Sequence, residues 1–353
     1  MKKLPLFPAS IVGSIPRPLV VRELIEKTDW DGTDANTMDA AVRFVVALQE
    51  RAGLDVVNDG EWRRRSYIGV IAELAHGFTL EINPADGRPW TVVTEKLAAK
   101  PAGFIAAEAK FVKQVARVAT KITLPAPALL GERLWDAERS KKAYPKRDDF
   151  VRACVAPLRA EIALLQDMGV EMVQIDDPHL CLFVDPDVRK KYDDPDRAAD
   201  FAVAMINETV QGFKGVKFAV HLCRRAGARV RGEKHHAGTY GPILKQLNNL
   251  RVQHLTMEFT AAGADDLESL GRLREDFELG LGVVDVTPGA PEAAALIAAR
   301  VERALTRIDK KRITLNPDCG FAPGSAAKVD TDEVYLKLKA EAEAARMLRA
   351  RYA

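Results

Sequence analysis

The sequence predicts a single α/β domain, spanning all 353 residues, built as a (β/α)8 TIM barrel. Eight short apolar runs are separated mainly by stretches of helical periodicity, which is the order expected of parallel strands joined by helices. Several of these runs end in polar clusters, as strands do at the carboxyl-terminal mouth of a barrel. No Gly-x-Gly-x-x-Gly turn follows the first run, which disfavours the alternative of an open doubly wound sheet that binds a dinucleotide.

The first half of the chain contains three predicted barrel strands and one excursion. Residues 10–14 form the first strand and its tight turn of small residues, whose backbone N–H groups suit an anion. A helix at 35–52 stops at Gly53 and leads to the second strand, 54–57, and the polar cluster 58–61. We then expect a hairpin of strands 78–83 and 90–96 around a turn at 84–87, a helix near 103–118 and the third strand at 121–127. The hairpin and helix after strand two form an excursion or lid.

The second half repeats the strand and helix pattern. A long charged loop, 132–147, precedes a helix capped near Asp148 or Asp149. The remaining predicted strands are 170–175, 218–220, 255–259, 279–284 and 313–315, and helices at 291–307 and 331–350 follow the last two. Residues 224–240, rich in Arg, Gly and His, suggest a mobile basic loop.

Composition excludes several classes of protein. The net charge is only +2, with 52 basic and 50 acidic residues, so we expect no nucleic-acid partner. No apolar run of 18 residues is present and the N-terminal stretch does not resemble a signal peptide, so we expect a cytoplasmic protein without a membrane partner. The four cysteines are scattered, which favours packing or chemistry over a disulfide framework.

Four residues at the ends of predicted strands form a candidate zinc site. His221 and Cys223 alternate along a strand end and therefore point the same way, while Leu222 points into the packing. Glu258 on the sixth strand and Cys319 after the eighth reach the same mouth. Two thiolates, an imidazole and a carboxylate suit Zn²⁺.

Other cysteines and histidines have plainer explanations. Cys154 lies in a helical pattern typical of core packing, and His179 with Cys181 follows a proline in a predicted loop, which makes a weaker ligand pair. Glu258 and Cys319 themselves have plain alternatives, an ion-pair partner and a small core residue.

Zinc held by two thiolates suits activation of an incoming thiol better than production of hydroxide. Carboxylates at the same mouth suit a cationic amine on that thiol, or else form a salt-bridged rim with nearby arginines. They are Asp59, Glu61, Asp176 and Asp177.

The chain resembles, over essentially its whole length, the C-terminal catalytic domain of cobalamin-independent methionine synthase. The resemblance is carried by motifs at strand ends: Ile11-Val12-Gly13-Ser14-Ile15-Pro16, Gly53-Leu54-Asp55-Val56 with Gly60-Glu61, Gln174-Ile175-Asp176-Asp177-Pro178, His221-x-Cys223, Glu258, and Asn316-Pro317-Asp318-Cys319-Gly320. It implies a Zn²⁺ site of His221, Cys223, Glu258 and Cys319. It also implies methyl transfer from a donor to homocysteine, with Gly13 and Ser14 binding the carboxylate, and with Glu61 and Asp176 as catalytic residues that bind the amine.

Three departures from the family pattern concern the donor. The large N-terminal half is absent, Asp177 replaces a longer glutamate, and Thr287 stands where the folate enzymes have a histidine proposed as proton donor. These features are similar to those of short stand-alone relatives with other methyl donors. The alternatives are an epoxyalkane:coenzyme M-type alkyltransferase, for which basic residues near Arg224 would bind a sulfonate, and a non-catalytic protein stabilised by zinc.

Overall fold

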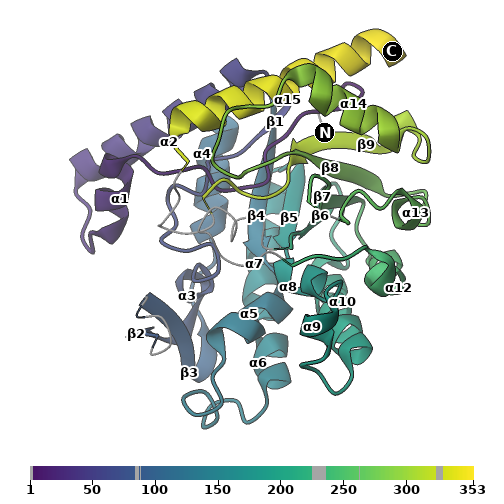
Figure 1. Cartoon of the computed structure of the whole chain (residues 1–353). Helices are drawn as coiled ribbons and strands as arrows, with labels where there is room; N and C mark the ends of the chain where they lie inside the picture. Colours follow the sequence, from purple (N-terminus) through teal and green to yellow (C-terminus); the bar gives the residue numbers. More distant parts are fainter. Residues whose placement is uncertain (1–2, 84–86, 88, 225–235, 262, 323–328) are drawn as a thin grey trace.

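Seven parallel strands form one curled sheet in the computed structural model, which describes residues 3–83, 87, 89–224, 236–261, 263–322 and 329–353 (Figure 1). In sheet order the strands are β1 (Val56–Val57), β4 (Ala119–Pro125), β5 (Met172–Asp176), β6 (Lys217–Leu222), β7 (His254–Glu258), β8 (Glu278–Val284) and β9 (Ile313–Pro317). Nearly all of their residues are buried, because helices cover the outer face and side chains fill the interior.

The N-terminal segment closes this sheet into a barrel. Ala9 forms a parallel bridge with Leu315 of β9, and Ser10 forms one with Val56 of β1. Backbone N–H groups donate from Ser10 to the Leu315 carbonyl and from Asp55 to the Ala9 carbonyl, both at 2.9 Å. Because β9 and β1 are the two edges of the sheet, this segment takes the eighth position and the predicted barrel is confirmed. The predicted strand at 10–14 is shorter than expected, since it pairs only at its first residue and then continues as a buried loop.

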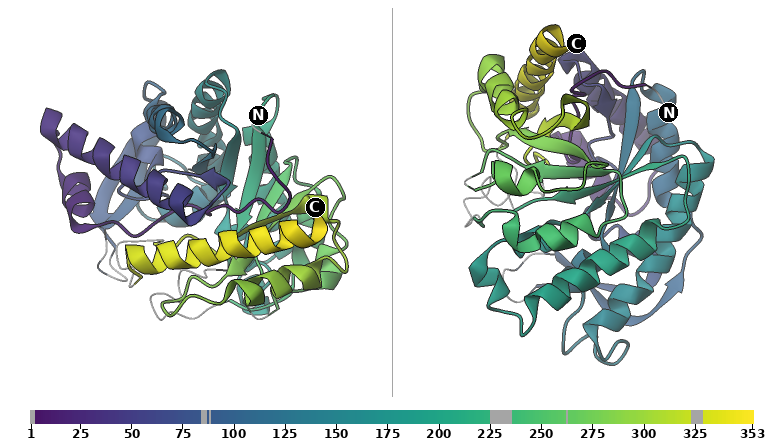
Figure 2. Two further views of the ribbon diagram at one scale, coloured as in Figure 1. Left: turned by 90° about the horizontal axis from the view of Figure 1, so that it is seen from above. Right: turned by 90° about the vertical axis from the view of Figure 1, so that its right-hand side faces the viewer.

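Helices surround the barrel. They are α1 (Leu19–Glu26), α2 (Gly32–Ala52), α3 (Ile71–Leu74), α4 (Phe104–Val115), α5 (Pro127–Leu134), α6 (Arg147–Ala153), α7 (Val155–Asp167), α8 (Pro178–Leu182), α9 (Pro186–Arg189), α10 (Pro195–Val210), α12 (Leu244–Asn248), α13 (Leu267–Leu270), α14 (Ala294–Ala304) and α15 (Thr331–Tyr352), with 3-10 turns η1 (Gly241–Ile243) and η2 (Lys310–Arg312). The long α15 packs against α14 and α2 (Figures 1 and 2). In the part of the chain that is described, no helix has the length and apolar character needed to span a membrane.

Local signals explain where the best-predicted helix begins and ends. The Asp31 side chain accepts a hydrogen bond from the backbone N–H of Asp34, and the Asp34 side chain accepts one from the backbone N–H of Asp31. This reciprocal pair is a capping box that starts α2. Gly53, with φ of 102°, ends the helix in the left-handed conformation that favours glycine. The chain therefore turns at once into β1 and the polar residues that follow it.

The predicted excursion is an antiparallel hairpin of β2 (Ala75–Ile82) and β3 (Pro89–Ala99), followed by α4. Most of its predicted turn, residues 84–86, lies outside the described residues. The hairpin is anchored beside α5, because the Trp90 indole donates to the Arg133 carbonyl at 2.8 Å and the Ser140 hydroxyl donates to the Val93 carbonyl at 2.6 Å.

Two local predictions are wrong. The predicted third strand ends at Pro125 rather than at residue 127, because Pro127 begins α5, where its fixed φ suits the first helical turn. The segment 132–147 therefore begins inside a helix. The next helix, α6, has Lys146 at its N-cap position, and Asp148 and Asp149 lie in its first turn, where they interact with the helix dipole.

Candidate metal centre

The predicted ligands meet at the carboxyl-terminal end of the barrel. His221 lies in β6, Cys223 follows the end of that strand, Glu258 ends β7, and Cys319 comes shortly after β9. Leu222, between the first two, is fully buried in the core, as the alternation along the strand predicts. Parallel strands of a barrel end at one face, which explains why residues far apart in sequence converge.

His221, Cys223 and Cys319 form a compact buried group whose ligand atoms all lie within 4.8 Å of one another. The two Sγ atoms are 3.2 Å apart, and neither cysteine is part of a disulfide. An imidazole and two sulfurs in a small buried space match the donor set of zinc sites.

The orientation of His221 also fits a metal ligand. Its Nδ1 lies 3.1 Å from Asp176 Oδ1, so a ring that coordinates through its other nitrogen donates this hydrogen bond to the carboxylate. The other ring nitrogen, Nε2, is buried and has no hydrogen-bond partner among the described residues. A buried nitrogen left in this way beside two sulfurs is a ready position for a cation.

Close contacts set the charges of this group. The hydrogen bond from Cys223 lowers the pKa of the Cys319 thiol to about 5, and His221 adds to this effect against the opposing effect of burial. Burial lowers the pKa of His221, but its hydrogen bond to Asp176 and its contact with Cys319 outweigh burial and raise that pKa to about 10. Without a metal, Cys319 is therefore a thiolate beside the imidazolium of His221. A bound metal cation would replace the positive charge of that imidazolium.

Glu258, the fourth predicted ligand, lies beside this group rather than within it. It is fully buried, and its Oε1 lies 3.4 Å from Cys223 Sγ and accepts the backbone N–H of Arg224 at 3.0 Å. The compact group that could hold a metal consists of the other three residues, so a ligand role for Glu258 stays a prediction.

Glu61 and Gly13, which are predicted to bind an amino acid, lie together and close to Asp176, the partner of His221. Glu61 is buried with a φ of 59°, and its Oε1 accepts the Thr123 hydroxyl at 2.8 Å. Burial raises the pKa of Glu61, and the charge of Asp176 adds to this effect while that of Arg64 opposes it. Gly13 lies so close that a Cβ there would come within 2.8 Å of Glu61 Oε1.

Ser14 connects this loop to the metal-binding segment. Its carbonyl accepts the Phe321 N–H at 2.9 Å, its hydroxyl accepts the Ala322 N–H at 3.3 Å, and a Cβ at Gly320 would come within 2.4 Å of that hydroxyl. The close approach requires glycine at this position. The loop that contains Gly13 and Ser14 is thus held directly against the chain that follows Cys319.

The structure corrects one further prediction. Arg224, expected in a mobile basic loop, is fully buried, and its guanidinium lies 4.3 Å from the centre of the Tyr240 ring. The Tyr240 hydroxyl donates to the Glu258 carbonyl at 2.9 Å, so this arginine belongs to the wall of the centre. Residues 225–235 of the predicted loop lie outside the described part.

The other cysteine and histidine predictions are partly changed by the fold. Cys154 is fully buried at the junction of α6 and α7, as predicted for core packing. His179 and Cys181 lie in the short helix α8 rather than in a loop, and His179 Nε2 contacts the Tyr192 hydroxyl at 2.9 Å. Thr287 donates its hydroxyl to Asp285 Oδ1 at 2.6 Å.

A polar pair inside the barrel was not predicted. Lys121 of β4 and Gln174 of β5 are almost fully buried beneath the centre, and Lys121 Nζ donates to Gln174 Oε1 at 2.9 Å. The sequence feature that could have predicted this pair is a charged or amide residue within an apolar strand. It occurs in Lys121-Ile122-Thr123-Leu124 and in Val173-Gln174-Ile175.

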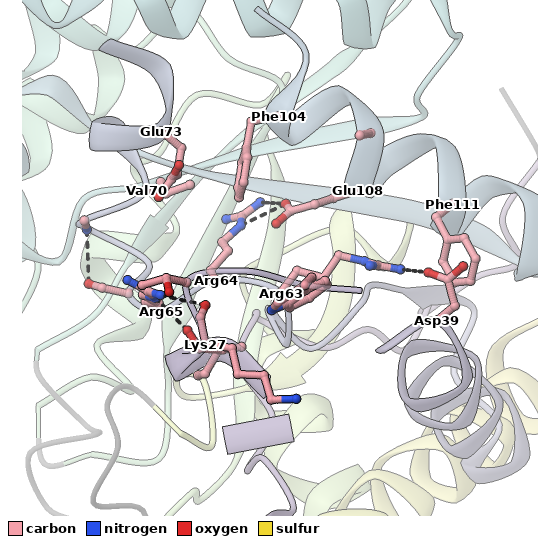
Figure 3. Close-up of a pocket in the computed structure, with 16 residues that line it drawn as sticks. Lys27, Asp39, Arg63, Arg64, Arg65, Val70, Glu73, Phe104, Glu108 and Phe111 are labelled. Atoms are coloured by element: carbon pink, nitrogen blue, oxygen red, sulfur yellow. Dashed lines mark hydrogen bonds and ion pairs between the residues drawn. The ribbon is translucent and has the colours of Figure 1, made fainter. Parts of the chain in front are cut away.

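A cavity of about 700 Å³ lies away from the sulfurs, between α1, α3 and α4 (Figure 3). Arg64, Glu108, Phe104 and Phe111 are among its lining residues, and both Arg64 Nε and Nη2 donate to Glu108 Oε2. None of the eight predicted site residues lines it, so the cavity is separate from the metal centre.

Comparisons with known proteins identify relatives of this chain. Residues 7–347 match the family model described as the catalytic domain of cobalamin-independent synthase. A methionine synthase of Saccharolobus islandicus is 29% identical over 336 residues, which cover 91% of this chain and 90% of that protein. A methionine synthase of Pyrococcus abyssi is 26% identical over 366 residues, covering 98% and 94% of the two chains.

Solved structures support the fold. A B12-independent methionine synthase from Shewanella sp. W3-18-1, in complex with selenomethionine, superposes with a TM-score of 0.78 over 98% of both chains at 22% identity. A B12-independent methionine synthase described as putative, from Listeria monocytogenes, superposes with a TM-score of 0.72 at 21% identity, covering 98% of this chain and 99% of that one.

Proposed function

The chain belongs to the cobalamin-independent methionine synthase family of methyltransferases, and we propose that it is a zinc-dependent enzyme that transfers a methyl group to the sulfur of homocysteine. The observation that carries this proposal is the contact of the group His221, Cys223 and Cys319 with Asp176, whose charge also acts on Glu61. A substrate that carries both a thiol and an amine requires a metal site for its sulfur and acidic residues for its ammonium group. Both are expected at one mouth of the barrel.

The proposed metal ligands are His221 through Nε2, Cys223, Cys319 and Glu258. When bound, zinc supplies the positive charge that keeps the substrate thiol deprotonated at neutral pH. Asp176 fixes the His221 ring by accepting the hydrogen bond from Nδ1. The backbone N–H of Arg224 fixes the Glu258 carboxylate beside Cys223.

The remaining predicted residues would hold the amino-acid end of homocysteine. The backbone of Gly13 and Ser14 would bind its carboxylate, and Glu61 with Asp176 would bind its ammonium group. Two acidic side chains suit a cationic amine, and their burial strengthens the attraction. This arrangement orients the substrate so that its sulfur points toward the cysteines.

The chemical step is a displacement at the methyl carbon. The substrate sulfur, as a thiolate, forms a new S–C bond with the methyl group while the bond between that carbon and the donor breaks. The electron pair of the broken bond leaves with the donor, which then takes up a proton. The buried walls of the barrel mouth exclude water and so protect the thiolate.

Calorimetric titration of homocysteine tests the proposal, first with zinc-loaded protein and then after zinc removal. We expect binding with proton release that depends on zinc. Coenzyme M, which has no amine, is the comparison ligand. Glu61→Gln should weaken the binding of homocysteine but not the binding of coenzyme M. Binding of coenzyme M but not homocysteine by the zinc-loaded protein would transfer the proposal to the alkyltransferase alternative.

A third outcome concerns the non-catalytic alternative. With cobalt in place of zinc, a visible spectrum that no thiol alters would indicate a closed structural site and would contradict the proposed enzyme.

A further inference from the structure

Lys121 and Gln174 lie inside the barrel beneath the metal centre and are 1% and 0% exposed. Lys121 Nζ donates to Gln174 Oε1 at 2.9 Å and to the carbonyl of Ile11. A buried ammonium group is costly unless its hydrogen bonds are satisfied, so both contacts constrain it strongly. Burial lowers the pKa of Lys121 to about 8, with Asp176 first among the acids that oppose this, so the side chain is mostly charged at neutral pH.

This ammonium group fixes the direction of the Gln174 amide. Gln174 Oε1 faces Lys121, and therefore its NH2 group faces the other way, donating to Asp176 Oδ1 at 2.7 Å and to the Val12 carbonyl at 3.1 Å. A reversed amide would place NH2 against the ammonium and oxygen against a carboxylate. The ammonium, the carboxylate and the carbonyl thus all favour the same orientation of the amide.

Both halves of the proposed site depend on these two hydrogen bonds. Asp176 Oδ1, held by Gln174, is also the atom that contacts His221 Nδ1 at 3.1 Å, so the ring is fixed with Nε2 toward the cysteines. The Val12 carbonyl, held by the same amide, immediately precedes Gly13 and Ser14. One side chain therefore supports a candidate metal ligand and the candidate carboxylate-binding loop.

We infer that Lys121 and Gln174 are positioning residues, which hold Asp176 and the Val12 backbone so that His221 is aligned for the metal and the Gly13 loop for the acceptor. The inference rests on the proposed function in taking His221 as a zinc ligand. Lys121 acts through Gln174, and Gln174 acts through Asp176. Neither side chain would contact the metal directly.

The test uses Gln174→Met and Lys121→Met, which remove the polar groups at similar side-chain length. The matched control is Gln246→Met, because Gln246 is 2% exposed and its Nε2 donates to Asp200 Oδ1 at 3.0 Å, between helices α12 and α10 rather than inside the barrel. For each folded variant the zinc dissociation constant is measured by competition with a chromophoric chelator. The visible spectrum of the cobalt-substituted protein and the melting temperature are recorded beside it.

We expect zinc affinity to fall roughly 10-fold or more in Gln174→Met, as it does when groups that orient metal ligands are removed. Lys121→Met should also lower the affinity for zinc. The visible spectrum of the cobalt-substituted protein should change in both variants, and the zinc affinity of the control should stay unchanged. If Gln174→Met does not fold, Lys121→Met carries the test alone.

Two results would overturn the inference. Folded variants that bind zinc within twofold of wild type, despite lower melting temperatures, would indicate a purely structural pair. Wild-type protein that binds no zinc would instead refute the proposed function, and the inference with it.

Discussion

Cys223 Sγ lies 3.2 Å from Cys319 Sγ, although the two residues are separated by 96 positions in the sequence. Two sulfurs held this close cannot both be bare thiolates, because like charges in a buried space repel strongly. They must share a proton or a cation. The barrel brings the strand ends that carry them together, and His221 and Glu258 lie beside the two sulfurs.

Replacing either cysteine should remove most of the metal binding. If four ligands share roughly 10–16 kcal/mol of binding free energy, the loss of one costs about 3 kcal/mol, or roughly 100-fold in affinity. We therefore expect Cys223→Ser and Cys319→Ser to retain little zinc after dialysis, measured by atomic emission. Cys154→Ser, which changes another fully buried cysteine, should keep the wild-type zinc content. Wild-type stoichiometry in both serine variants would exclude the proposed ligands.

The same pair should be sensitive to oxidation when no metal is bound. A mild thiol oxidant such as diamide would remove two electrons and two protons from the two thiols and join them in a disulfide, because the thiolate of Cys319 is the attacking form. Zinc should prevent this reaction by occupying both sulfurs. Thiol counting and peptide mass spectrometry measure the result, and equal oxidation rates with and without zinc would contradict it.

Gly13→Ala should weaken homocysteine binding without changing zinc content. The new methyl group would come within 2.8 Å of Glu61 Oε1, and Glu61 cannot move easily because it is buried and hydrogen-bonded to Thr123. Displacement of a charged partner should lower the affinity roughly 10-fold or more. Gly32→Ala is the control, because no other atom lies within 4 Å of a Cβ at that position. Calorimetry that finds equal affinities in both variants would place the amine elsewhere.

The sequence predicted most of the barrel because its signals are local. Apolar runs of strand length and the stop signal Gly53 act over a few positions, and the predicted helix at 35–52 differs from α2 only at its start, where the cap Asp31 was not predicted. Alternation along one strand was sufficient to place His221 and Cys223 on the same side. Pro127 was misassigned because it fits either a strand end or a helix start, and only packing distinguishes the two.

Long-range contacts were beyond the reach of the sequence. Nothing near Arg224 in the chain indicates that its side chain is buried on Tyr240, 16 residues later, and a run of Arg and Gly favours a solvated loop. The hydrogen bonds of Lys121 and Gln174 also appear only when β4, β5 and the N-terminal segment are brought together. A polar residue in a buried strand marks such a position but does not identify its partners.

Asp177 should make stability depend on pH. Its Oδ1 caps α8 by accepting the Leu180 N–H at 2.9 Å, while its Oδ2 is buried without a hydrogen-bond partner among the described residues. Burial, the largest effect, raises the pKa of Asp177 from 3.8 to about 7. Between these two values the folded protein holds a proton that the unfolded chain has lost, so this group makes the fold less stable as the pH rises through that range.

Asp177→Asn should remove this dependence, because the amide oxygen can still cap the helix and no charge has to be buried. We expect the variant to be more stable than wild type at pH 8, and this advantage to be smaller by on the order of 2 kcal/mol at pH 5. Urea unfolding of metal-free protein at the two pH values measures the difference. Asp194→Asn changes an exposed capping aspartate of α10 in the same way and should leave the slope unchanged. If Asp177→Asn is no more stable than wild type at pH 8, the charged Asp177 carboxylate does not destabilise the fold. That result would contradict the raised pKa of Asp177.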